Sequence, residues 1–138
     1  MHKPIPRPLA RPGWLLAAAL LGACGAPAPQ PSVTGTWEGR IPDYDTGIRL
    51  RLTQDGSAVT GEFLTSGAAT PTVFRHWGNL SGTLEGDQLK LQAVGDPPDH
   101  QGAVATFQGT VQAGVYSGTV TTVAGSSVDT TNFSTHRQ

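Results

Sequence analysis

The chain has 138 residues and a formal net charge of −1, which suits one ordinary domain and gives no overall basic character. The basic residues are unevenly placed, because Lys3, Arg7 and Arg11 stand close to the start. From Cys24 onward six Lys/Arg stand against ten Asp/Glu, a net charge of −4 that argues against binding to nucleic acid.

Residues 1–23 have the layout of a secretory signal peptide. Basic residues precede an apolar run from Trp14 to Leu21, far shorter than the ~20 residues that span a bilayer. Small residues then lead to Cys24, the only cysteine of the chain. We therefore expect a signal peptide over 1–23 and a Pro-rich, semi-rigid tether over 24–32.

Leu21-Gly22-Ala23-Cys24 resembles the lipobox of bacterial lipoproteins. The resemblance implies that Cys24 carries diacylglycerol, becomes the first mature residue and gains further acylation with chains such as palmitate. A single acyl chain anchors a protein only marginally, so stable attachment takes more than one. Because residue 25 is Gly and not Asp, the family's sorting rule implies the outer membrane where the source has two membranes. The expected location is the cell envelope, with membrane lipid as one partner.

Residues 33–138 show the short apolar and polar alternation, broken by glycine-containing turns, that is typical of an all-β sandwich or barrel. A polar-Gly-polar-apolar pattern occurs at 34–37, 60–63, 81–84, 108–111 and 117–120. The two-residue period puts each Gly on the face of the bulky residue that follows, where it permits a close backbone approach. The pattern predicts a single eight-stranded antiparallel up-and-down barrel with strands at 33–41, 47–53, 58–65, 79–84, 88–94, 104–111, 115–122 and 127–135.

The interior of this predicted barrel is formed by large apolar side chains: Trp37, Ile48, Leu50, Leu52, Val59, Phe63, Leu80, Leu84, Leu89, Leu91, Phe107, Val111, Tyr116, Val120 and Phe133. Eight strands enclose a space that side chains can fill or that can hold one small ligand. A meander places its tight turns, at 55–56, 85–87 and 113–114, at one end. The segments 41–47, 66–78, 95–103 and 123–126 then lie at the other end, away from the tether.

Gly35-Thr36-Trp37 resembles the Gly-x-Trp signature on the first strand of lipocalins and avidins, which form calycin-type barrels. Residues 58–63 are similar to the third strand of the streptavidin group. Avidins line their pocket with several tryptophans and hydrogen-bonding side chains. From Cys24 onward this chain has only two tryptophans, Trp37 and Trp77, and the predicted interior is mostly aliphatic. Both features argue against biotin as the ligand.

The long-loop end carries the candidate binding residues, since binding side chains often lie on loops of a rigid scaffold and Tyr, Trp and Arg are favoured at interface hot spots. The candidates are Tyr44, Arg75, His76, Trp77, Asp99 and His100. A purely structural interpretation is that Asp, Pro and Gly form turns there and that Trp77 covers the barrel mouth. The set His76, Asp96, Asp99 and His100 matches no metal-binding spacing, so we expect neither a metal nor another cofactor.

The sequence contains no catalytic motif, and Glu38, Glu62 and Glu85 are expected at separate outward positions. We therefore expect a non-enzymatic lipoprotein that binds an envelope protein or a small ligand at its long-loop end. Two alternatives remain open: a lipocalin-like carrier of an apolar ligand, which requires a large cavity, and a protease inhibitor of the small β-barrel type.

Overall fold

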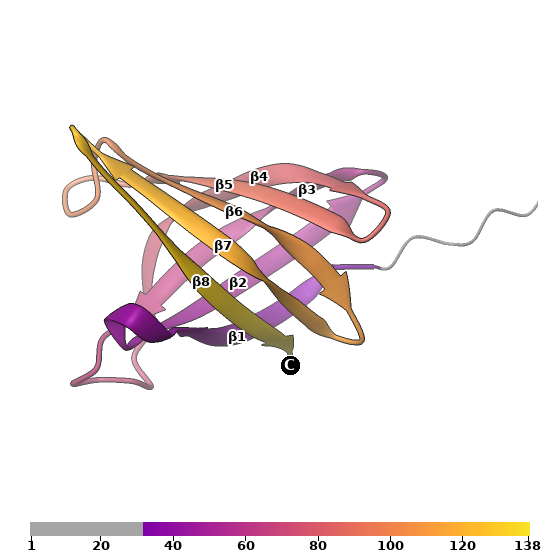
Figure 1. Cartoon of the computed structure of the whole chain (residues 1–138), viewed down its shortest axis with the longest axis horizontal. Coiled ribbons are helices and arrows are strands. Elements are labelled where there is room, and N and C mark those ends of the chain that lie inside the picture. The colour runs from indigo at the N-terminus through magenta and orange to yellow at the C-terminus, as the bar shows by residue number, and fades with distance from the viewer. Residues whose placement is uncertain (1–31) are drawn as a thin grey trace, which may run out of the picture.

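A computed structural model describes residues 32–138, in which eight antiparallel strands close into one barrel (Figure 1). The elements are β1 (Gly35–Ile41), the 3-10 helix η1 (Pro42–Tyr44), β2 (Thr46–Asp55), β3 (Ala58–Ser66), β4 (Arg75–Glu85), β5 (Gln88–Gly95), β6 (Ala103–Gln112), β7 (Val115–Ala124) and β8 (Ser127–Arg137). Each strand pairs with its neighbours in the chain, and β8 pairs with β1. The predicted fold class is confirmed.

The predicted signal peptide, Cys24 and all but the last residue of the predicted tether lie outside the described residues. Within residues 32–138, no helix is both long and apolar enough to span a membrane.

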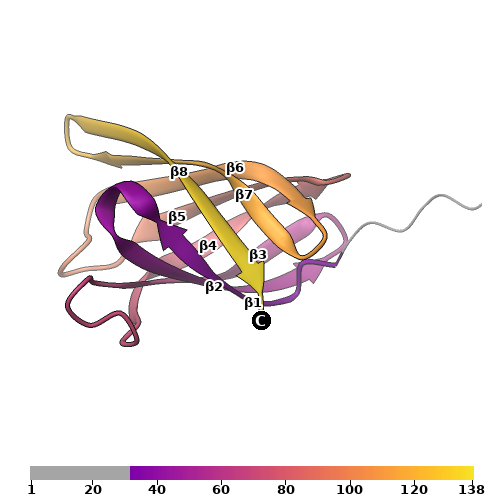
Figure 2. The same ribbon diagram turned by 60° about the horizontal axis from the view of Figure 1, so that its bottom comes forward.

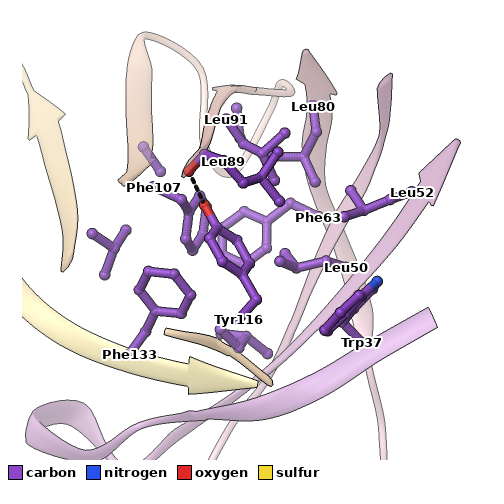
Figure 3. Close-up of a cluster of buried hydrophobic side chains, with 14 of the residues drawn as sticks. Trp37, Leu50, Leu52, Phe63, Leu80, Leu89, Leu91, Phe107, Tyr116 and Phe133 are labelled. Atoms are coloured by element: carbon purple, nitrogen blue, oxygen red, sulfur yellow. Dashed lines mark hydrogen bonds between the residues drawn. The ribbon is translucent and has the colours of Figure 1, made fainter. Parts of the chain in front are cut away.

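Every residue of the predicted interior is at most 5 % exposed, and Figure 3 shows how these side chains meet. Aromatic rings pack edge to face across the barrel, with centroids 5.0 Å apart for Phe63 and Phe107, 5.2 Å for Phe107 and Phe133, and 4.9 Å for Phe133 and Tyr116. The Tyr116 hydroxyl donates a hydrogen bond to the Leu89 carbonyl oxygen at 3.0 Å. The middle of the barrel is therefore filled by its own side chains.

Two hollows lie on the outer wall of β4, β5 and β6, one lined by residues such as Thr83, Lys90 and Gln108 and the other by Ser81 and Gln92 among others. The lipocalin-like alternative requires a large internal cavity, and the filled core gives it no support.

Four of the five repeated glycines, Gly61, Gly82, Gly109 and Gly118, lie where the backbone of a neighbouring strand approaches closely, as the sequence pattern predicts, whereas Gly35 does not. A Cβ atom at Gly82 would collide with the backbone of Lys90, and one at Gly109 would collide with the backbone of Ser117. The barrel is coiled tightly enough that a side chain at these inward positions would push the adjacent strand away.

The two ends of the barrel differ as predicted. Tight turns at 56–57, 86–87 and 113–114 lie at one end, where Figure 1 also shows the start of β1. The opposite end, here called the open end, carries η1, the loop at 67–74 and the loop at 96–102.

A loop and a turn are present at the two remaining predicted connections of the open end, but both are shorter than predicted. The loop predicted at 66–78 ends earlier, because β4 begins at Arg75 and continues the β3 ladder through the pairs Leu64–His76 and Thr65–Arg75. The connection predicted at 123–126 is a two-residue turn, since Val123 pairs with Val128 and Gly125 adopts a φ of +62°. In the resulting β7–β8 hairpin (Figure 2), β7 is paired with β6 up to Ala124, whereas β8 extends beyond its pairing with β1, which ends at Ser134.

The β1–β8 seam is the shortest ladder of the barrel, with pairs from Trp37–Arg137 to Arg40–Ser134. Arg137 reinforces it, because its guanidinium lies 4.5 Å from the centre of the Trp37 ring and donates to the Thr34 carbonyl oxygen at 2.8 Å. The barrel is thus closed partly by side-chain contacts and not by strand pairing alone.

Candidate binding site at the open end of the barrel

A β-bulge in β4 directs Trp77 into the barrel mouth. Phe63 pairs with Gly78 and Leu64 pairs with His76, which leaves Trp77 as the additional residue on β4. Bulges re-aim side chains in this way and are frequent beside functional sites. The Trp77 side chain is buried and packs on Phe63, with ring centroids 5.2 Å apart.

His100, from the loop at 96–102, stacks on Trp77 with ring centroids 5.1 Å apart and an interplanar angle of 24°. Backbone hydrogen bonds of 3.0 Å hold this loop: Asp96 N–H donates to the Trp77 carbonyl, and His100 N–H donates to the Asp96 carbonyl. Trp77 therefore has the hydrophobic core on one side and the ring of His100 on another.

A chain of charged side chains connects β2, β3 and β4 with the loop at 96–102. Arg51 Nη1 lies 3.2 Å from Glu62 Oε1, and His76 Nδ1 lies 2.9 Å from Glu62 Oε2. The other ring nitrogen of His76, Nε2, lies 2.5 Å from Asp96 Oδ2. His76 thus connects β3, through Glu62, with the first residue of the loop that carries His100.

The two carboxylates change the acidity of His76. Burial lowers its pKa, but the hydrogen bonds to Asp96 and Glu62 and the charges of both carboxylates outweigh this effect and raise the pKa above the ordinary 6.5. A neutral imidazole donates from only one nitrogen, whereas the imidazolium donates from both. Both ring nitrogens of His76 face carboxylate oxygens, and this geometry suits the imidazolium form.

At the open end the inner wall of β5 and β6 carries small side chains. Ala93 pairs with Ala105, and both are buried, as is Ala103 at the start of β6. These three alanines belong to the same buried hydrophobic cluster as Trp77.

Three of the six candidate residues come together here: His76, Trp77 and His100. Trp77 is buried and packs against the rings of Phe63 and His100. Tyr44 lies on η1 and is 50 % exposed, Asp99 is exposed on the loop, and Arg75 is exposed at the start of β4. In residues 32–138, no hydrogen bond or ion pair joins Tyr44, Arg75 or Asp99 to the His76–Trp77–His100 group.

The candidate binding residues did not include Glu62, and Asp96 was considered with His76 only in the metal set that the spacing excluded. Glu62 lies on the outer face of β3, as expected, and its side chain is 33 % exposed, but it also contacts both Arg51 and His76. The adjacent strands of a hairpin place such outward side chains within reach of each other, but the bulge at Trp77 shifts the register. Within the described part of the chain, no group of three or more His, Cys, Asp or Glu is arranged to hold a metal ion.

No family model matches the chain, and no curated protein matches it either. Among solved structures, the barrel is similar to that of apo shwanavidin, with a TM-score of 0.58 over 78 % of this chain and 98 % of that chain. The class of structure is therefore an avidin-like, calycin-type barrel, as the Gly35-Thr36-Trp37 resemblance implied. At 12 % identity the likeness shows the fold alone.

Proposed function

We propose that this chain is a non-enzymatic lipoprotein of the cell envelope that binds a small ligand at the open end of its barrel, on the face of Trp77 that His100 covers. The Trp77–His100 stack is the observation that carries the proposal. A ligand with a planar ring displaces His100 and takes its place on the indole. An envelope protein presenting such a ring is the other form of partner compatible with the same site.

The charges around the stack favour a particular ligand chemistry. Asp96 and Asp99 belong to the loop that carries His100, and Asp99 is exposed there. From Cys24 onward the chain is also acidic, with six Lys/Arg against ten Asp/Glu. A planar group that is neutral or positively charged and carries hydrogen-bond donors therefore suits the site better than an anion.

The arrangement of the barrel agrees with a tethered binding protein. The described chain starts at the tight-turn end, so a lipid anchor on Cys24 would leave the Trp77 end facing away from the membrane. The filled interior restricts the ligand to the mouth, since the rings of Phe63 and Phe107 block entry further into the barrel.

The proposal is tested by removing the ring that occupies the site. In the His100→Ala variant, 4-methylimidazole added as a probe should bind on Trp77 and shift the NMR signal of its indole N–H. The wild type should respond more weakly, because its own imidazole competes, and Trp77→Leu with His100→Ala should not bind the probe. His136→Ala removes an exposed imidazole at the far end of the barrel and serves as the matched control.

Equal probe affinity in the wild type and in His100→Ala would contradict the proposal, as would probe-induced shifts confined to the outer wall at Lys90 and Gln108. Native mass spectrometry of the protein from its own envelope then identifies the natural ligand. A planar compound retained by the wild type and lost from Trp77→Leu is the expected result.

A further inference from the structure

We propose that His76 is a proton-dependent clasp that fastens the loop at 96–102, and with it His100, over Trp77. The inference adds regulation by pH to the site described above. Its effect on ligand binding rests on the proposed function, whereas the movement of the loop does not.

The contacts of His76 require its protonated form. Both ring nitrogens face carboxylate oxygens, at 2.9 Å for Glu62 and 2.5 Å for Asp96. After loss of one proton, one of these nitrogens presents a lone pair to a carboxylate, and that contact becomes repulsive. The imidazole is 34 % exposed, so water can take up the released proton.

The surrounding charges decide which contact opens. Glu62 lies within β3 and keeps a second cation, Arg51 of β2, when His76 is neutral. Asp96 follows β5, and His76 is the cationic side chain that the structure places against it. Arg75 precedes His76 in the chain, and Asp99 and His100 lie further along the loop, but within residues 32–138 the hydrogen bonds and ion pairs of the His76 ring go to Glu62 and Asp96. Deprotonation therefore releases Asp96.

Release of the Asp96 side chain loosens the loop that carries His100. The loop keeps its backbone hydrogen bonds from Asp96 N–H to the Trp77 carbonyl and from Ala103 N–H to the His100 carbonyl. Loss of the contact between His76 and the Asp96 side chain therefore increases the mobility of the loop without detaching it. His100 then leaves Trp77 more often, and the mouth becomes more accessible.

The direction of the pH effect follows from the raised pKa of His76. A raised pKa means that the folded, clasped form binds the proton more tightly than the open form. The clasp is complete below the ordinary value of 6.5 and is lost as the pH rises through the higher pKa of the folded state. Ligand affinity at the mouth should accordingly rise with pH over that range.

The test is an NMR titration of the full chain without any ligand, in a His100→Phe background. Phe keeps a ring against Trp77 and removes the second imidazole of the site. The signals of His76, of the Trp77 indole N–H and of the Ala103 amide should shift with one common midpoint above 6.5. In Asp96→Asn the His76 midpoint should fall and the pH-dependent shifts of Trp77 and Ala103 should be lost.

Asp55→Asn is the matched control, because Asp55 is exposed at the opposite end of the barrel, and it should titrate like its parent. Unchanged pH dependence of Trp77 and Ala103 in Asp96→Asn would overturn the clasp, whatever the outcome of the 4-methylimidazole experiment. Loss of that dependence together with absence of probe binding would leave the clasp standing and contradict the proposed function alone.

Discussion

The phenol of Tyr116 is enclosed by the barrel, between the ring of Phe133 and the backbone of Leu89. Burial raises the pKa of Tyr116 far above its ordinary 10.0, because the phenolate would have to form away from water. The folded state therefore holds this proton more tightly than the unfolded state does. The contribution of protonated Tyr116 to the free energy of unfolding is complete below pH 10.0 and is lost as the pH rises further.

This linkage predicts the course of an alkaline titration. In the Tyr44→Phe variant Tyr116 is the only tyrosine left of two. Its ionisation, followed by absorbance at about 295 nm, should coincide with the loss of the β-sheet circular dichroism signal, because the phenolate forms only on unfolding. Ionisation of Tyr116 in a protein that keeps its native signal would contradict this prediction.

Gly82 tests the packing of the strands at single-residue scale. A methyl group there would collide with the Lys90 carbonyl, so Gly82→Ala should lower the free energy of unfolding in urea by about 1–3 kcal/mol, the usual cost of overpacking. At Gly67 an added Cβ meets nothing within 4 Å, and Gly67→Ala should change stability by less than ~0.5 kcal/mol. Equal losses in both variants would show that strand contact is not the cause.

At the scale of elements, the seam between β1 and β8 is where the barrel depends most on side chains. Arg137→Ala removes the contact with the Trp37 ring and the hydrogen bond to the Thr34 carbonyl. We expect the free energy of unfolding to fall by about 1–2 kcal/mol, since both contacts are lost. The loss is not larger because Arg137 is exposed and water partly replaces its contacts.

Hydrogen exchange should locate the effect of Arg137→Ala. Amide protection should fall in β1 and in the last residues of β8, while the β6–β7 ladder, paired from Ala103–Ala124 to Gln112–Val115, keeps its protection. Arg75→Ala, at an exposed arginine on β4, is the control. Uniform loss of protection around the barrel would show that Arg137 does not act at the seam.

The elements also show how far the sequence could be interpreted. Inward positions such as Leu89 and Leu91 were predictable because side chains alternate between the two faces of a strand. Once the turns fix where a strand begins, this alternation decides which residues point inward. The start of β4 was not, because Arg75-His76-Trp77-Gly78 breaks the alternation. The bulge that explains this break depends on pairing with Phe63 and Leu64, which are distant in the chain. The same bulge is the reason that the contact between His76 and Glu62 could not be predicted from the sequence.

At the scale of the whole molecule, the barrel and its two unlike ends followed from turn lengths, since an antiparallel meander alternates its connections between ends. The clasp did not follow, because Asp96 meets His76 only after β4 and β5 have paired and the loop has turned back. Side chains joined across a loop carry no periodic signal. Fold and core were therefore accessible from the sequence, whereas the contacts that define the mouth were not.

The lipid anchor is the feature that would set the orientation of the whole molecule. The resemblance of Leu21-Gly22-Ala23-Cys24 to a lipobox predicts acylation of the single cysteine. Each buried methylene contributes about 0.8 kcal/mol, so two or more chains hold a protein stably on a bilayer. Labelled palmitate supplied to the source cells should appear in the wild type and in Ser32→Ala, but not in Cys24→Ala. A wild-type protein that carries no label and keeps residues 1–23 would contradict the anchor and, with it, the outward orientation of the Trp77 end.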